Sequence, residues 1–125
     1  MSNQPKVFGP YSSIRKAEGL YFVAGQVGVD KGGKAPKSFE DQFRLVIENL
    51  SRVLESQNLS LSNIINLRVY LTDMADFTKL NQLFEKHFMG IAPSRECVAV
   101  QALPPVAKNN TKLRVEISAV ATKAG

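Results

Sequence analysis

The sequence predicts one α+β domain over residues 1–125, a mixed sheet with two helices packed on one face. Two stretches carry apolar residues at helical spacing, and several shorter ones alternate apolar and polar residues as strands do. Their order along the chain is β-β-α-β-α-β-β. Two helices cover only one face of such a sheet, so we expect oligomerisation to bury the other.

Composition sets the class of protein. The 125 residues are 44% hydrophobic and 22% charged, as in ordinary soluble domains. The single cysteine excludes an intrachain disulfide, and no apolar run has the length of a membrane span or the pattern of a secretory signal. We therefore expect a cytoplasmic protein with no membrane partner.

The net charge of +5 raises the question of a nucleic-acid partner. The basic residues are scattered, and only Lys31, Lys34 and Lys37 cluster, in a glycine-containing loop. No aromatic residues lie between them to stack on bases. The pattern favours a solvated loop over a nucleic-acid interface.

The first half of the chain predicts a hairpin and a helix. Residues 12–16 and 20–24 are β-rich and flank a Glu18-Gly19 turn, and residues 25–29 continue the second strand irregularly. Ser38 followed by Asp41 predicts a capped helix start. The apolar stripe of this helix is Phe43, Val46, Ile47, Leu50, Val53 and Leu54. Its opposite face, expected to be solvated, is Gln42, Arg44, Glu48, Ser51, Arg52 and Glu55.

The second half predicts a strand, a helix and two further strands. The first strand should bury Ile65, Leu67, Val69 and Leu71 on one face. The helix should start near Asp76 and stop at Gly90, with an apolar stripe of Phe77, Leu80, Leu83, Phe84, His87 and Phe88. His87 is the only histidine and has no partners spaced for a metal or catalytic site, so we interpret it as a packing residue.

The last two strands carry the candidate chemistry. Arg95 and Cys97 share one face of the strand that begins near Pro93, and Glu116 interrupts the alternation of the final strand. Glu116 should point to the uncovered face of the sheet. Arg95 and Cys97 should point there too if Val98 and Val100 face the helices.

Arg95 and Glu116 together suggest hydrolysis of an activated C=N bond. The arginine is suited to hold a substrate carboxylate, and the glutamate to exchange a proton with water or a leaving nitrogen. An imine carbon is already electrophilic, so the reaction needs no metal. Two plainer readings stay open: an ordinary Arg-Glu ion pair across neighbouring strands, and a surface arginine on an edge strand.

Several motifs together resemble the RidA (YjgF) family of reactive-intermediate deaminases, also described as an endoribonuclease L-PSP family. The most specific are Pro93-Ser94-Arg95 with Cys97, and Val115-Glu116-Ile117. The others are Gly9-Pro10-Tyr11, Ala24-Gly25-Gln26, Arg68-Val69-Tyr70-Leu71, Asp73, Asp76-Phe77, Asn81, Phe84 and Phe88. Their order and spacing carry the resemblance, which covers most of the chain.

The resemblance implies a chorismate-mutase-like fold assembled as a homotrimer, with clefts between adjacent subunits. It implies that Arg95 holds the carboxylate of a 2-imino or 2-enamino acid such as 2-aminoacrylate, and that Glu116 positions or activates water. The products are a 2-oxo acid and ammonia, and no cofactor takes part. It further implies that the cleft is lined by Tyr11, Gly25, Asn81 and Cys97.

Four features depart from the family pattern. Ala24 stands where many members have serine, Glu96 places a negative charge beside Arg95, Gln101 replaces a small or basic residue, and the segment 104–112 is long. Two alternatives to a deaminase stay open, the first because of Ala24 and Glu96 and the second because of the net charge and of activities described for the family. One is a non-catalytic protein of the same fold that binds small carboxylates, and the other is an RNA-acting protein.

Overall fold

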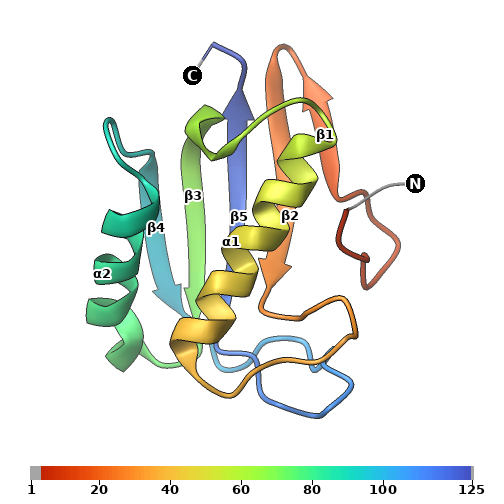
Figure 1. Cartoon of the computed structure of the whole chain (residues 1–125), viewed down its shortest axis with the longest axis vertical. Coiled ribbons are helices and arrows are strands. Elements are labelled where there is room, and N and C mark those ends of the chain that lie inside the picture. The colour runs from red at the N-terminus through yellow and green to blue at the C-terminus, as the bar shows by residue number, and fades with distance from the viewer. Residues whose placement is uncertain (1–3, 125) are drawn as a thin grey trace.

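A computed structural model describes residues 4–124 as a five-stranded sheet with two helices on one face (Figure 1). The predicted α+β class and element order are confirmed. The strands lie in the order β1-β2-β5-β3-β4, and β4 runs parallel to β3 while the other pairs are antiparallel. The elements are β1 (Ile14–Ala17), β2 (Leu20–Val27), α1 (Phe39–Glu55), β3 (Ile64–Leu71), α2 (Phe77–His87), β4 (Ser94–Ala99) and β5 (Val115–Thr122), with short 3-10 turns at Leu61–Asn63 and Met74–Asp76.

The predicted hairpin joins β1 to β2 through a tight turn. Glu18 and Gly19 have φ values of 53° and 79°, so both central residues are left-handed, as the twist of a two-residue hairpin favours. The register of β2 against β5 shifts between Val23 and Gln26. This irregularity lies where the sequence predicted one, and Gly25 is within it.

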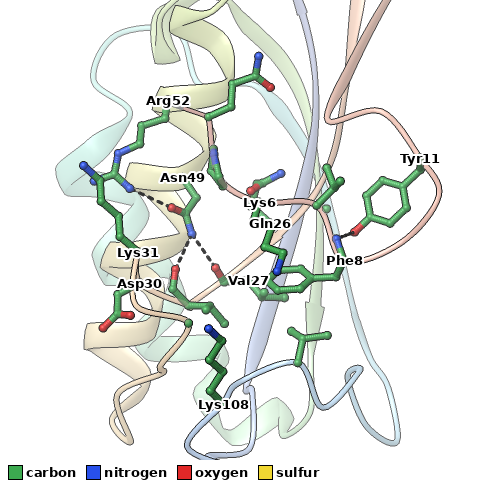
Figure 2. A pocket seen from close by; sticks show the side chains of 17 residues that line it. Lys6, Phe8, Tyr11, Gln26, Val27, Asp30, Lys31, Asn49, Arg52 and Lys108 are labelled. Carbon is green, nitrogen blue, oxygen red and sulfur yellow. Dashed lines mark hydrogen bonds between the residues drawn. The ribbon is translucent and has the colours of Figure 1, made fainter. Parts of the chain in front are cut away.

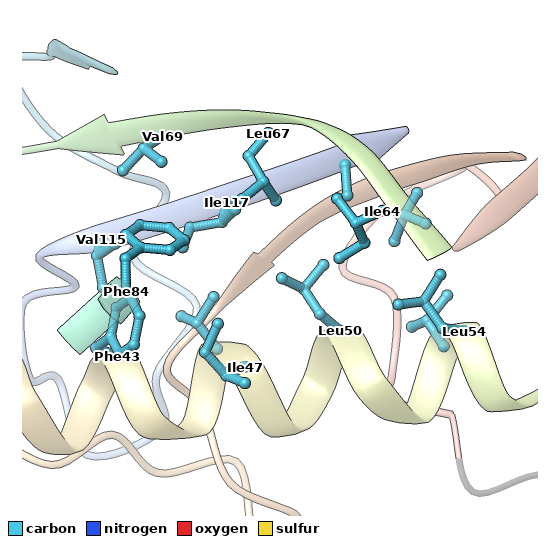
Figure 3. Packing of buried hydrophobic residues seen from close by; sticks show 14 of the residues in the cluster. Phe43, Ile47, Leu50, Leu54, Ile64, Leu67, Val69, Phe84, Val115 and Ile117 are labelled. Atoms are coloured by element: carbon cyan, nitrogen blue, oxygen red, sulfur yellow. The ribbon is translucent and has the colours of Figure 1, made fainter. Parts of the chain in front are cut away.

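Helix α1 starts where the sequence predicted, because the Ser38 hydroxyl accepts a hydrogen bond from the Asp41 amide. Its apolar stripe packs on the sheet in the main core (Figure 3). The prediction that Gln42 is solvated is wrong: its side chain is fully buried. Its amide nitrogen donates to the carbonyls of Pro36 and Lys112, and its amide oxygen accepts from the Arg114 amide. Gln42 thus joins α1 to the start of β5.

Strand β3 departs from the predicted alternation at its first residues. A bulge between Ile64 and Asn66 leaves Ile65 38% exposed, while Ile64 takes the buried place. Leu67, Val69 and the rest of the strand then follow the predicted alternation. The apolar run of two isoleucines allowed either register, and the bulge decides between them.

A second, smaller core lies under the loops at the other end of the sheet. It contains Val27, Val29, Ala35, Ala107 and Leu113. The long segment 104–112 therefore packs against the loop that follows β2. No helix in the described part of the chain is long and apolar enough to span a membrane.

Candidate active site in two halves

Arg95 lies on the helix-covered face of the sheet, against α2. In the parallel pairing it is level with Leu67, which is buried beneath the helices. Its Nη2 donates to the Asn81 Oδ1 on α2 at 2.7 Å. An amide oxygen orients the guanidinium without cancelling its charge, so the remaining N–H groups keep their affinity for an anion.

Two aromatic rings of α2 complete the support for this guanidinium. The Arg95 Cζ lies 5.6 Å from the centre of the Phe77 ring and 5.0 Å from that of Phe84. Phe84 is buried and packs edge-on against Phe43 at 5.3 Å, whereas Phe77 is 37% exposed. The sequence predicted both rings only as core residues. Their spacing on α2 relative to Asn81 was the available signal, because positions three and four apart share a helix face.

Cys97 follows Arg95 on the same face and packs partly against the main core. Burial raises the pKa of its thiol, and the nearby Arg95 opposes that shift only in part. A raised thiol pKa reduces the thiolate fraction, so Cys97 is suited to be a wall of the site rather than a nucleophile. Asn81, Arg95 and Cys97 form what we call the arginine half-site.

Glu116 lies on the other face, the one that no helix covers. It is level with Tyr70 on β3, and its chain neighbours Val115 and Ile117 are fully buried beneath the helices. Burial raises the pKa of its carboxyl group above the ordinary value of 4.5. No ion pair or hydrogen bond within residues 4–124 engages this carboxyl group.

Gly25 lies directly against Glu116. A Cβ at Gly25 would meet the Glu116 Oε2 at 2.4 Å, a distance no side chain tolerates without movement. The position therefore requires glycine for Glu116 to keep this placement. Tyr11 and Gly25 line one cavity, in which the Tyr11 hydroxyl accepts a hydrogen bond from the Phe8 amide at 3.3 Å (Figure 2). Tyr11, Gly25 and Glu116 form the glutamate half-site.

The expectation that Arg95 and Cys97 share the uncovered face with Glu116 is wrong. Val98 instead of Cys97 faces that side and is 46% exposed, because β4 pairs with β3 so that Cys97 is level with the buried Val69. The alternative of an Arg-Glu ion pair across neighbouring strands is also excluded within one chain, since β3 lies between β4 and β5. The structure thus brings the candidate residues together as two separate groups.

Glu96 does not compete for Arg95. It faces the uncovered side, where its Oε1 lies 3.6 Å from the Arg68 Nε, and both side chains are largely exposed. An exposed pair of this kind is worth little stability, and it is the alternation of side chains along β4 that places Glu96 on the face opposite Arg95. Arg68 also lines an open hollow of about 560 Å³ on this face, together with Tyr11 and Ala24.

No group of three or more potential metal-ligating side chains occurs among the described residues. His87, interpreted from the sequence as a packing residue, has its ring 5.6 Å from that of Phe43, at an angle of 53°, and is exposed overall. The candidate chemistry of this fold therefore rests on Arg95 and Glu116 and on the residues that orient them.

Comparison with known proteins gives consistent results. The profile of the family described as Endoribonuclease L-PSP matches residues 1–123. A RutC family protein of Pyrococcus horikoshii is 40% identical, over 97% of this chain and 93% of the relative. The chloroplastic Reactive Intermediate Deaminase A of Arabidopsis thaliana is 33% identical over 94% of this chain and 61% of the relative. The crystal structure of RidA from the Antarctic bacterium Psychrobacter superposes with a TM-score of 0.86 at 30% identity, covering 95% of this chain and 93% of that one.

Proposed function

Since this chain belongs to the Endoribonuclease L-PSP family and has the fold of its RidA members, we propose that it hydrolyses reactive 2-imino and 2-enamino acids to 2-oxo acids and ammonia. The observation that carries the proposal is the pair of uncompensated charges. Arg95 is oriented by an amide and two rings but has no carboxylate partner in the described chain, and Glu116 is half-buried without a cation.

The reaction needs only these two groups and water. Arg95 binds the substrate carboxylate and so fixes the imine carbon in place. Glu116 accepts a proton from water as the oxygen adds to that carbon, which gives a carbinolamine. That proton passes to the nitrogen and completes the neutral carbinolamine. Glu116 then carries the hydroxyl proton of the carbinolamine to the same nitrogen, the C–N bond breaks, and ammonia leaves as the carbonyl forms. A 2-enamino acid enters this sequence as its imine tautomer. One water is consumed, and the site returns to its starting protonation.

We further propose that the site is completed between copies of the chain in a homotrimer. The arginine half-site lies at the edge strand β4, and the glutamate half-site lies on the central strand β5 and on β2, with β3 between the two. The uncovered face of the sheet exposes Phe22 (48%), Val98 (46%) and Ile65 (38%). An apolar face of this kind favours association, and cyclic association places the arginine half-site of one copy against the glutamate half-site of the next.

The test is decay of 2-aminoacrylate, generated in place by a serine dehydratase and followed by its absorbance. We expect the protein to accelerate decay and Arg95→Ala to lose about 100-fold or more in kcat/KM, as for loss of a substrate-positioning group. Arg44→Ala, which removes an exposed arginine of α1, is the matched control and should keep the full rate.

A non-catalytic carboxylate-binding role is the second candidate. Ala24 favours it, since Ala24 lines the open-face hollow without the hydroxyl that many relatives would place there. Calorimetric titration with 2-oxobutanoate separates the two roles. Binding without acceleration of imine decay would contradict the deaminase proposal and support the binding role, and acceleration of decay would exclude the binding role.

A further inference from the structure

A cavity of about 480 Å³ lies between α1, the end of β2 and three surface segments (Figure 2). Its lining comes from the N-terminal segment, from residues 25–33, from α1 and from residues 106–108. No residue of α2, β3, β4 or β5 contributes. The cavity is therefore separate from Arg95, and it shares Tyr11 and Gly25, two of the three residues of the glutamate half-site.

Four cationic side chains surround this cavity. They are Lys6, Lys31, Arg52 and Lys108. None of them forms an ion pair with a carboxylate within residues 4–124. The one acidic residue of the lining, Asp30, uses its Oδ1 to accept a hydrogen bond from the Lys34 amide at 2.9 Å. The neutral amide leaves the Asp30 charge in place, so four cationic groups stand against one carboxylate, and the cavity keeps an excess of positive charge that the scattered basic residues of the sequence did not predict.

Two of these cations are held in place by the fold. Arg52 donates from its Nη1 to the Asn49 Oδ1 at 3.2 Å, and Asn49 is 4% exposed. The Asn49 Nδ2 in turn donates to the carbonyls of Val27 and Val29 at 3.0 and 3.1 Å, which fixes the amide and with it the guanidinium. Arg52 was predicted to be solvated, but it is half-buried at the cavity wall.

Lys108 is positioned by the contact between two loops. Its amide donates to the Gly33 carbonyl at 2.7 Å, and its side-chain carbons lie over Gly33, where a Cβ would meet the Lys108 Cδ at 2.8 Å. The Asn109 side chain bonds both the amide and the carbonyl of Ala35. The long segment that departs from the family pattern therefore delivers one of the cations and holds it beside the loop after β2.

Part of the wall is apolar and aromatic, and the rest includes the polar side chains of Gln26 and Asn49. Phe8, Val27, Val29 and Val106 line the apolar part beside the Tyr11 ring. A volume near 480 Å³ lies within the usual range for small-molecule sites, which combine an apolar lining with a few charged groups. Cations grouped beside an apolar wall suit a ligand that carries a doubly charged head on a small hydrophobic body.

We propose that this cavity binds phosphate monoesters that carry a small apolar or aromatic group. A phosphate monoester bears a charge of about −1.5 to −2 near neutral pH and offers three acceptor oxygens, whereas a monocarboxylate bears one charge. Arg52 supplies a planar fork for two of those oxygens, and the lysines act as point charges around them. The apolar wall receives the ester group.

The test compares four compounds by calorimetric titration of the full chain at constant ionic strength: phenyl phosphate, inorganic phosphate, benzoate and phenol. We expect phenyl phosphate to bind at least about tenfold more tightly than each of the others, since it alone meets both the cations and the apolar wall. Binding of benzoate or inorganic phosphate as tight as that of phenyl phosphate, or no binding of phenyl phosphate, would overturn the proposal.

Two variants locate the binding. Arg52→Gln and Lys108→Met should each weaken the binding of phenyl phosphate by about tenfold or more, as expected for loss of a charge-assisted hydrogen bond. Lys37→Met removes an exposed lysine of the neighbouring loop that does not line the cavity, and it should leave binding unchanged. Equal weakening by Lys37→Met would show general charge attraction and contradict the site. Circular dichroism and thermal melting check that each variant folds, and all three should retain imine decay, so that failure here is distinct from failure of the deaminase proposal.

Discussion

Arg95 and Glu116 lie on opposite faces of one sheet, on strands that β3 separates. The surroundings of each residue orient its charged group without neutralising it. An amide and two aromatic rings support Arg95, and Glu116 lies half-buried against a glycine that leaves room for it. Because neither neutralises the other within the chain, we infer that a site using both residues is assembled from two copies.

The contact between Asn81 and Arg95 gives the first prediction. Asn81→Ala removes the hydrogen bond that orients the guanidinium, so we expect KM for the imino acid to rise more than kcat falls. Asn81→Asp retains the size of the side chain but places a carboxylate at this contact, where it neutralises Arg95. It should therefore weaken substrate binding more than Asn81→Ala does, which steady-state imine decay measures. An aspartate variant that binds as well as the wild type would contradict an anion-holding role for Arg95.

Gly25 gives a prediction based on space alone. The new methyl group of Gly25→Ala would lie 2.4 Å from the Glu116 Oε2, so the carboxyl group must move. A misplaced catalytic group costs about 100-fold in rate, and we expect a loss of that order in kcat while the melting temperature changes little. Gly32→Ala is the matched control, because its added methyl group meets only the Asp30 side chain at 3.3 Å. If Gly25→Ala retained the full rate, the position of Glu116 would not matter to the reaction.

The pH dependence follows from Glu116. Its pKa is raised above 4.5 by burial, and only the deprotonated carboxylate accepts a proton from water. The rate should therefore fall as pH decreases through this raised pKa, with an acid limb in kcat/KM that lies above pH 4.5. Glu116→Gln should lose the limb together with most of the rate. A profile that stays flat down to pH 4.5, or a limb that persists in the glutamine variant, would assign the proton transfer elsewhere.

The sequence predicted the fold well where one face of an element was clearly apolar. The α1 stripe and the alternation of β5 both correspond to buried residues of the core. Strand β4 could not be oriented in this way. One of its faces carries Arg95 and Cys97 and the other Glu96 and Val98, so each mixes charge with hydrophobicity, and the contact with Asn81 on α2 decides the outcome.

Other features depend on contacts between segments far apart in the chain. Gln42 is a polar residue on a helix, yet it is buried, and three backbone groups from the segments before α1 and before β5 satisfy its side chain. The cationic cavity likewise combines Lys6, Lys31, Arg52 and Lys108 from four places in the sequence. Contacts between segments that lie far apart in the sequence cannot be predicted from local composition. The individual candidates Arg95 and Glu116 were identifiable from the sequence, whereas their separation onto two faces required the sheet order.

The most direct test of the two-chain site is complementation between Arg95→Ala and Glu116→Gln. Each variant alone should be nearly inactive in imine decay. When the two are unfolded together, mixed in equal amounts and refolded, random cyclic assembly should place an intact arginine half-site against an intact glutamate half-site in about one quarter of the clefts. We predict recovery of imine decay to about that fraction of the wild-type rate. A mixture that forms mixed oligomers but stays as inactive as its two components would contradict the account.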